Sequence, residues 1–98
     1  MIAQRFLPGA RIDLLDAINH YASSSRKLGT DFLDELVRNL EFVAEFPEAS
    51  PCVRGEVRKK ILRKFPYSLL YLVDDGVPVV VAVMHHRRRP DYWHHRVR

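Results

Sequence analysis

The segment 67–85, YSLLYLVDDGVPVVVAVMH, constrains the fold more than any other part of the sequence. The pair Asp75-Gly76 supplies the positive φ angles of a tight primed turn, and a strand-like run lies on each side of it. Residues 77–85 are apolar on both faces, which is typical of a central strand covered on both sides. Pro78 lacks an amide hydrogen and belongs at the start of such a strand. The segment therefore predicts two antiparallel strands, 67–73 and 77–85.

The remaining elements follow from periodicity and from breakers. Residues 2–7 predict a short first strand, which Pro8-Gly9 ends. Apolar positions recur at helical spacing over residues 10–22 and over about 25–46, where Gly29 is a weak point, and Ser25 offers an N-cap between the two. Residues 47–55 are expected to form a loop and residues 56–64 another strand. The order β-α-α-β-β-β predicts one α+β domain over 1–98, a helical hairpin packed on a small twisted antiparallel sheet.

Two helices can cover only one face of this sheet, although its strands are apolar on both faces. The second face, or a groove beside the hairpin, is expected to be covered by a partner or by the chain's own C-terminal tail. The residues alone leave both alternatives open. Tyr67 and Tyr71 are expected in the core.

Positive charge lies in two blocks, each beside an apolar run. Residues 1–53 hold five basic and eight acidic side chains, a net of −3, whereas residues 54–64 hold six basic and one acidic, a net of +5. The tail 85–98, HHRRRPDYWHHRVR, holds five arginines and one aspartate, a net of +4. If the blocks converge, they form a basic patch suited to RNA, DNA or an acidic protein surface.

Composition also excludes several classes of protein. Cys52 is the only cysteine, so an internal disulfide and a four-cysteine zinc site are excluded. No apolar run approaches the ~20 residues of a membrane span. The N-terminus lacks the basic and apolar regions of a signal peptide. A cytoplasmic protein without membrane association is therefore expected.

The tail carries the residue types that RNA cleavage requires. Cleavage needs a base for the 2′-hydroxyl, cations for the phosphorane charge and an acid for the leaving oxygen. His85 or His86 is a candidate base, the arginines at 87–89 are candidate cations, and Tyr92 is a candidate acid or stacking ring. The same mixture suits single-stranded RNA binding without chemistry.

The tail histidines do not predict a metal site. Neighbouring histidines on a strand point to opposite faces, and no spacing here repeats a zinc pattern. We therefore expect neither a metal nor a cofactor. Trp93 is expected either to pack the tail onto the helices or to contribute to target recognition.

The order and spacing of several motifs resemble the ParE/RelE toxins of bacterial type II toxin–antitoxin systems. The resemblance covers nearly the whole chain, and it implies a helical hairpin on a twisted antiparallel sheet. It also implies a hetero-oligomer with an antitoxin whose C-terminal segment wraps the toxin. The motifs are Ala10-x-x-Asp13-Leu14-x-x-Ile18-x-x-Tyr21, Phe32, Phe46-Pro47, Phe65-Pro66-Tyr67-x-x-x-Tyr71-x-Val73 and His85-x-x-Arg88-x-Pro90-x-Tyr92-Trp93.

This family splits by target. RelE-like members cut messenger RNA in the ribosomal A site, whereas characterised ParE-like members act on DNA gyrase. RelE-like enzymes carry a catalytic arginine directly after the position that corresponds to Tyr67, and this chain has the neutral Ser68 there. Phe65-Pro66 is also more similar to the ParE branch. The resemblance thus implies a ParE-like toxin that inhibits an essential target, DNA gyrase, and is neutralised by a cognate antitoxin.

Two alternatives stay open. One is a RelE-like ribosome-dependent mRNA endoribonuclease with His85, His86, Arg88 and Tyr92 in the catalytic roles. The other is a non-toxic nucleic-acid-binding module. Under the first interpretation no residue is catalytic, and the expected target-binding residues are Arg58, Lys60, Arg63, Arg87, Arg88, Arg89, Tyr92 and Trp93. The expected antitoxin contacts, at the margins of the helical hairpin, are Leu14, Ile18, Phe32, Leu36 and Leu40.

Overall fold

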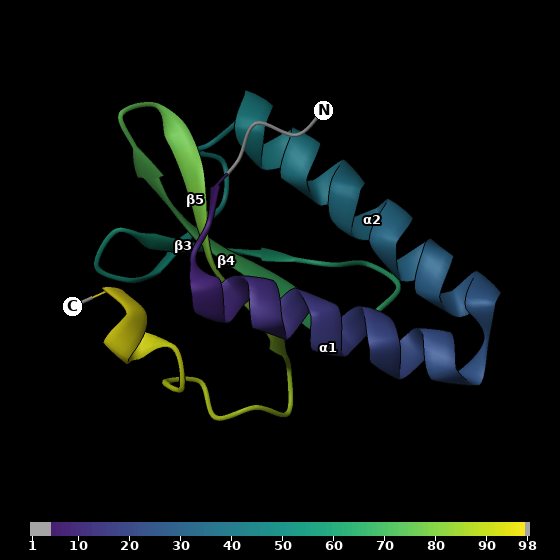
Figure 1. Ribbon diagram of the computed structural model, residues 1–98. Helices are drawn as coiled ribbons and strands as arrows, with labels where there is room; N and C mark the ends of the chain where they lie inside the picture. Colours follow the sequence, from purple (N-terminus) through teal and green to yellow (C-terminus); the bar gives the residue numbers. More distant parts are fainter. Residues whose placement is uncertain (1–4, 98) are drawn as a thin grey trace.

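The computed structural model describes residues 5–97, and these form two α-helices packed on a five-stranded sheet (Figure 1). The predicted α+β architecture is confirmed, and the order of its elements is as predicted apart from one additional strand, Cys52–Arg54. In chain order the elements are β1 (Arg5–Phe6), α1 (Pro8–Ser24), α2 (Arg26–Glu45), β2 (Cys52–Arg54), β3 (Val57–Ile61), β4 (Tyr67–Asp74), β5 (Val77–His85) and the 3₁₀-helix η1 (His94–Val97).

The sheet has the strand order β1-β5-β4-β3-β2, with the predicted hairpin β4–β5 at its centre. β3 and β5 both pair with β4 in antiparallel orientation. β1 pairs with β5 in parallel orientation, so the sheet is mixed. The sequence had predicted a wholly antiparallel sheet. A parallel pair needs a long connection, and the helical hairpin with the following strands supplies it.

Three predicted boundaries need correction. The expected strand 56–64 is observed over Val57–Ile61. The expected strand 2–7 is observed at Arg5–Phe6, and residues 1–4 lie outside the described part of the chain. The expected loop 47–55 contains β2, which pairs with β3 through Cys52 opposite Arg58. Gly55, at φ 55°, makes this return possible because that backbone conformation is strained for residues with a Cβ.

The helical hairpin depends on the residues at its turn. Ser25 is extended, and its Oγ accepts a hydrogen bond from the amide of Leu28 at 3.4 Å, as an N-cap does. α2 continues through Gly29 without interruption, although the sequence suggested a weak point there. A Cβ on Gly29 would lie 2.9 Å from the Cβ of Ala22 on α1. Gly29 therefore allows the two helices to approach closely next to their turn.

The turn between β4 and β5 has the predicted conformation. Asp75 and Gly76 have φ angles of 52° and 78°, both positive, as a primed turn requires.

A β-bulge changes the alternation of side chains in β5. Leu70 pairs with Ala82, whereas Tyr71 pairs with Val80, so Val81 is the extra residue in the ladder. The bulge gives neighbouring residues of β5 the same orientation. Val80 and Val83 pack in the cluster beneath the helices, whereas Val81, Ala82 and Met84 pack on the opposite face.

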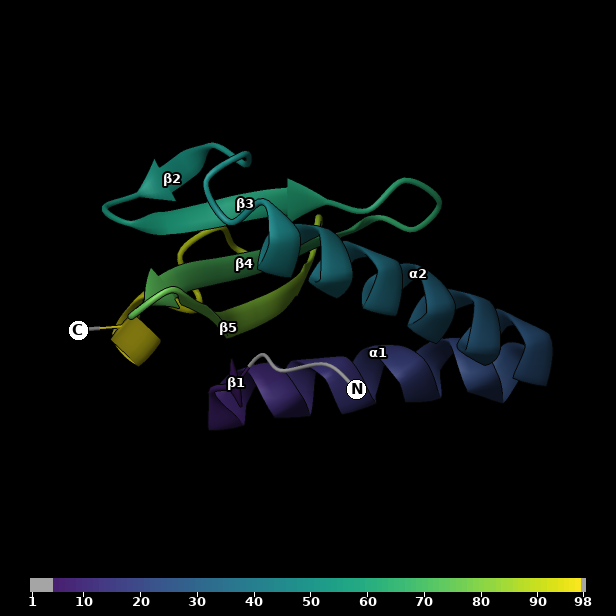
Figure 2. The same cartoon turned by 90° about the horizontal axis from the view of Figure 1, so that it is seen from above.

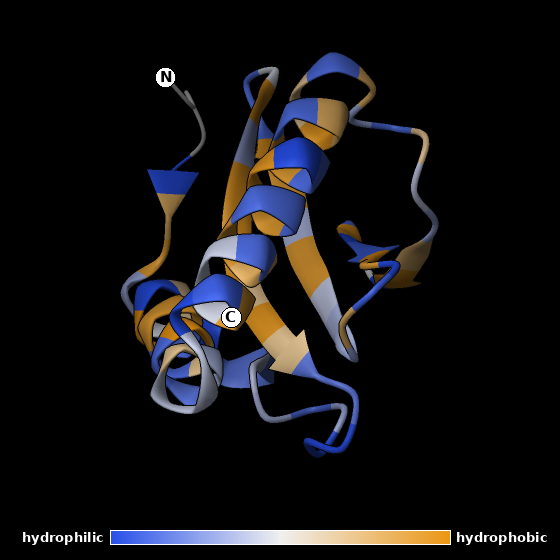
Figure 3. Ribbon diagram, turned by 90° about the vertical axis from the view of Figure 1, so that its right-hand side faces the viewer, coloured by the Kyte–Doolittle hydropathy of each residue, from blue (hydrophilic) through white to orange (hydrophobic). Residues whose placement is uncertain are grey.

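The helices cover one face of the sheet and the C-terminal tail covers the other, as Figure 2 shows. On the helix side, aromatic rings of Tyr21, Phe32, Phe65 and Tyr67 contact one another at centroid distances of 4.9–6.0 Å. Hydrophobic residues follow the strands and the helix faces turned toward them (Figure 3). Tyr67 and Tyr71 are buried, as predicted.

Trp93 anchors the tail against the second face of the sheet. Its side chain packs with Leu70, Val81 and Ala82, and with Val57 on β3. Of the two alternatives for this face, the structure therefore confirms the chain's own tail. Over the described residues, neither helix combines the length and apolar character needed to cross a membrane.

Candidate functional site

Asp13 on α1 is the centre of the polar contacts that hold the tail. Its Oδ2 accepts hydrogen bonds from the Tyr92 hydroxyl at 2.8 Å, from Arg96 Nη1 at 2.8 Å and from the Val83 amide at 3.2 Å. Arg96 Nη1 also donates to the carbonyl oxygen of Val81, the bulge residue, at 3.0 Å. One carboxylate thus joins the first helix, the central strand and the tail.

The Asp13–Arg96 ion pair is largely withdrawn from water. The two side chains are 7% and 14% exposed, and the guanidinium reaches Asp13 by passing over Gly9. A Cβ on Gly9 would lie 2.5 Å from Arg96 Nε. Glycine at this position therefore leaves the room that the arginine needs.

Tyr92 is held at its ring and at its hydroxyl. The guanidinium carbons of Arg88 and Arg96 lie 4.0 and 5.0 Å from the ring centroid. Burial raises the pKa of Tyr92, and the hydrogen bond to Asp13 raises it further. The hydroxyl therefore keeps its proton at neutral pH and donates it to Asp13.

His85, which ends β5, and His86, which follows it, also make contacts. His85 Nδ1 accepts a hydrogen bond from the Arg87 amide at 3.0 Å, and burial together with nearby cationic groups lowers the pKa of His85. His86 Nε2 lies 2.8 Å from Oγ of Ser68. Ser68 is completely buried, so its hydroxyl is not accessible to a substrate.

The first basic block divides between the two faces of the sheet. Arg58 Nη1 donates to the carbonyl oxygens of Glu48 and Ser50 at 3.1 and 2.7 Å, and so ties down the loop before β2. Lys60 Nζ lies 5.0 Å from the ring centroid of Phe42 on α2. The side chain of Lys59, which lies between Arg58 and Lys60 in the sequence, points to the face of the sheet that the tail covers. The basic block therefore does not form one surface.

Arg63 lies on the helix side as well. Its backbone amide and that of Lys64 donate to the buried carboxylate of Glu35 on α2. The Arg63 side chain lines a shallow groove with Arg38 and Phe42 of α2. This groove is on the other side of the sheet from the tail.

Arg87, Arg88 and Arg89 are exposed in the segment that follows β5. Arg89 Nε forms an ion pair with Asp91 at 3.3 Å, and this contact lowers the pKa of Asp91. Arg88 lines a groove beside α1 with Asp13, Asp16 and His20. The expected target residues therefore occupy separate surfaces: Arg87, Arg88 and Arg89 on the tail, Arg58, Lys60 and Arg63 beside α2, with Tyr92 and Trp93 packed inward.

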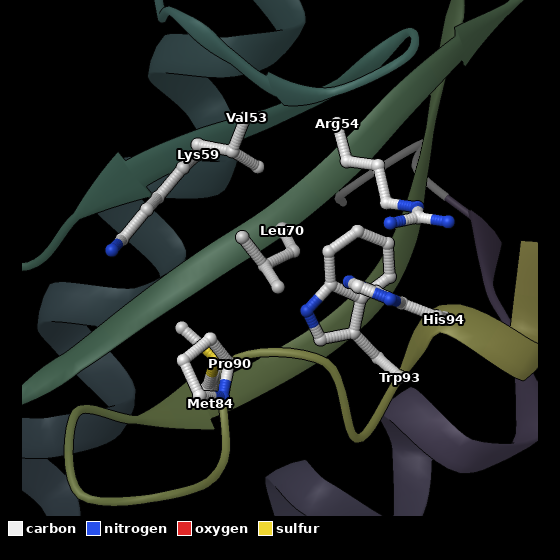
Figure 4. Close-up of a pocket in the computed structure, with 8 residues that line it drawn as sticks. All are labelled: Val53, Arg54, Lys59, Leu70, Met84, Pro90, Trp93 and His94. Atoms are coloured by element: carbon white, nitrogen blue, oxygen red, sulfur yellow. The ribbon is translucent and has the colours of Figure 1, made fainter.

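A pocket brings together two cations of the basic block 54–64 that are not among the expected target-binding residues. Arg54 of β2 and Lys59 of β3 line it with Trp93 of the tail (Figure 4). We call this hollow the tail pocket. Strict alternation along β3 places Lys59 on the face opposite Arg58 and Lys60. The face on which Lys59 lies could therefore have been predicted from the strand pattern. Nothing in the local sequence pairs Arg54 with the tail.

The expected antitoxin contacts are mostly interior. Phe32, Leu36 and Leu40 are buried in the core between α2 and the sheet, and folded chain covers them from every side. Leu14 and Ile18 on α1 are half-buried against the same core. Contact with an antitoxin through these residues stays a prediction. Within the described residues, no group of three or more histidine, cysteine or carboxylate side chains is arranged to hold a metal.

Comparison with known proteins gives one family. Residues 5–90 match the profile of the ParE toxin of type II toxin–antitoxin systems, parDE. A solved structure titled as a chromosomal ParDE toxin–antitoxin system from P. aeruginosa is similar in fold, with a TM-score of 0.71 over 87% of this chain and 96% of the other, at 16% identity. No curated protein matches the chain. Because the profile spans most of the sequence, the chain belongs to the ParE toxin family of type II toxin–antitoxin systems.

Proposed function

We propose that this protein is a cytoplasmic toxin that inhibits DNA gyrase and that a cognate antitoxin holds it inactive. Membership of the ParE family supports this, because the characterised ParE-like toxins act on gyrase. The observation that carries the choice of gyrase over the ribosome is Ser68. It occupies the position of the RelE-like catalytic arginine, and its side chain is 0% exposed.

The other candidate catalytic groups are poorly suited to RNA cleavage. The Tyr92 hydroxyl is bound to Asp13 at 2.8 Å, and its raised pKa makes it a weak acid. The lone pair of His85 Nδ1 accepts the Arg87 amide, so the neutral ring carries its proton on Nε2 and has no free basic nitrogen. A general base must reach the proton that it removes. These contacts favour a protein that inhibits by binding.

We place the gyrase contact on the exposed arginines at 87–89. They follow β5 in one exposed segment, and exposed cations increase the rate of association with an acidic partner. Changing Arg87 and Arg89 to glutamate is expected to abolish toxicity while the fold is kept. The matched control changes Arg11 and Arg26, exposed on the helices, to glutamate and is expected to stay toxic.

We place the antitoxin contact on apolar residues at the surface of the helical hairpin. Ile12 and Leu15 on α1 are 60% and 53% exposed, and Leu28 and Leu33 on α2 are each 40% exposed. Large apolar side chains exposed on one helical hairpin are candidates for a protein contact. Changing Ile12 and Leu15 to serine is expected to leave toxicity intact but to prevent rescue by the cognate antitoxin.

The experiment that tests the proposal is a brief induction of the toxin alone in bacteria, with incorporation of labelled thymidine and labelled leucine followed over minutes. Arrest of thymidine incorporation first supports inhibition of gyrase, and purified toxin should then inhibit DNA supercoiling by purified gyrase. Arrest of leucine incorporation first would instead support the ribosomal endoribonuclease. Continued growth with neither arrest would favour the non-toxic nucleic-acid-binding module.

A further inference from the structure

The tail pocket is a hollow with a volume of about 270 Å³ between the sheet and the C-terminal tail. Its apolar lining comes from Leu70 of β4, Met84 of β5, and Pro90 and Trp93 of the tail (Figure 4). Small-molecule and cofactor pockets usually have about 300–1,000 Å³. The tail pocket lies just below the lower end of this range, and its volume is enough for one large side chain with a short piece of backbone.

The polar part of the lining contains two cations and His94. Arg54 and Lys59 extend beside the apolar floor from β2 and β3, and no carboxylate lines the pocket. Within residues 5–97, neither cation forms an ion pair. Figure 4 shows the Arg54 guanidinium near the outer edge of the Trp93 ring and the Lys59 ammonium at the opposite end of the pocket. An occupant with two or more separated negative charges would complement both.

Trp93 supplies a hydrogen-bond donor that the described residues leave without a partner. Its indole Nε1 is buried and makes no hydrogen bond within the described part of the chain. The nitrogen-bearing edge of the ring faces Leu70, on the side of the pocket where Met84 and Pro90 also lie (Figure 4). A buried donor without an acceptor costs free energy. Met84 has an unbranched, adaptable side chain that can make room for an acceptor.

We propose that the tail pocket binds an acidic peptide segment of another protein, with a large aliphatic side chain as its anchor. The anchor rests on Leu70, Met84 and Pro90. A backbone carbonyl of the peptide accepts the hydrogen bond from Trp93 Nε1. Aspartate or glutamate residues on each side of the anchor pair with Arg54 and Lys59.

The environment of Trp93 favours a peptide over a nucleic acid. Single-stranded nucleic acids bind by stacking bases on an exposed aromatic face. Trp93 is only 2% exposed, because it packs against the sheet and meets the ring of His94 edge-on at 4.4 Å. An aliphatic anchor needs no free ring face. This inference is independent of the proposed inhibition of gyrase, because it concerns only the chemistry of this pocket.

The single tryptophan provides a direct measurement. In the ¹⁵N-labelled full chain, one indole N–H resonance reports on Trp93. The probe is the acetylated and amidated peptide Asp-Glu-Leu-Asp-Glu, added to millimolar concentration. We expect a saturable downfield shift of the indole proton. Replacing the leucine of the peptide by alanine should weaken binding by about tenfold or more, because several buried methyl and methylene groups are lost.

Variants separate the contributions of charge and donor. Arg54→Glu with Lys59→Glu should abolish the shift, whereas the control pair Arg11→Glu with Arg26→Glu, with the same change of net charge, should not. Trp93→Phe removes the donor, and peptide binding, followed through the His94 backbone amide, should weaken several-fold. Backbone spectra establish that each variant is folded.

Two results would overturn the proposal. One is the absence of any shift of the indole resonance when the acidic leucine peptide is added to the unmodified chain. The other is an equal response to Lys-Lys-Leu-Lys-Lys or to an oligouridine, which would show that the pocket does not select acidic peptides. Neither result depends on whether the chain inhibits gyrase.

Discussion

The hydroxyl of Tyr92 donates a hydrogen bond to Asp13 across 79 positions of the chain, and this contact fixes the C-terminal tail on the first helix. The same aspartate binds Arg96, so the tail is attached to α1 at two points on either side of the buried Trp93. The tail is thus an integral part of the fold, and its exposed residues lie mainly in the segment 86–91 that follows β5.

Tyr92→Phe removes the hydroxyl and keeps the ring. We expect a loss of about 1–2 kcal/mol in the free energy of unfolding, because a hydrogen bond to a charged acceptor is lost while Arg96 still neutralises Asp13. Toxicity should remain, since the hydroxyl serves the fold. Urea unfolding and growth assays measure the two effects, with Tyr21→Phe as the control. Loss of toxicity in a folded Tyr92→Phe protein would support the alternative of a ribosome-dependent endoribonuclease.

Asp13→Asn should be more harmful than Tyr92→Phe. The substitution leaves the Arg96 guanidinium, 14% exposed, without its counter-charge. Removing one partner of a buried ion pair costs about 3–5 kcal/mol. We expect a loss near the lower end of that range, because asparagine still offers an oxygen acceptor. Asp16→Asn, exposed on the same helix, is the control, and equal unfolding midpoints for the two variants would contradict the role given to Asp13.

The sequence predicted the structural features that depend on residues close together in the chain. Asp75-Gly76 identified the central hairpin, and Ser25 identified the boundary between the helices, because turns and caps are local. The ion pair of Asp13 with Arg96 lies beyond such reasoning. The two residues are 83 positions apart, and their meeting depends on the path of a tail that has little secondary structure.

The division of the basic residues shows the same limit. Lys59 and Lys60 are adjacent and carry the same charge, yet they lie on opposite faces of the sheet. Alternation separates them in principle. The bulge at Val81 shows why alternation alone is not sufficient, since Val81 and Ala82 are adjacent and share one face. The tail pocket is lined by Trp93, and the position of Trp93 follows only from the path of the folded tail.

His85 makes stability depend on pH. Burial is the main cause that lowers the pKa of His85 in the folded chain, followed by the cationic groups of Arg87, His86 and His20. The unfolded chain therefore binds more protons below the ordinary histidine pKa of ~6.5, and stability from this group falls as pH drops through that value. His85→Gln should reduce the difference in urea midpoint between about pH 7.5 and about pH 5.5. His95→Gln, on the exposed end of the tail, is the control, and an unchanged difference in His85→Gln would refute this account.

Glu35→Gln tests the contact between α2 and the turn after β3. Both carboxylate oxygens of Glu35 accept hydrogen bonds from the backbone amides of Arg63 and Lys64. Glutamine keeps one acceptor and places an amide donor near the second N–H. We expect a loss of about 1–3 kcal/mol in the free energy of unfolding and faster amide exchange at residues 63 and 64. Glu41→Gln on the exposed face of α2 should change neither.

Gly29→Ala sets two effects of opposite sign against each other. Alanine is favoured over glycine within a helix by about 1 kcal/mol. The new Cβ would, however, lie 2.9 Å from the Ala22 Cβ and 3.1 Å from the Ala22 Cα. The second atom is backbone and cannot rotate away, so relief requires the two helices to separate, and overpacking of this kind costs about 1–3 kcal/mol. We therefore expect net destabilisation, measured by thermal or urea unfolding. Thr30→Ala, one position further and exposed, gains helix propensity without the clash and should stabilise the chain. If Gly29→Ala stabilised the protein as much as Thr30→Ala does, the close approach at Gly29 would not be what joins the two helices at their turn.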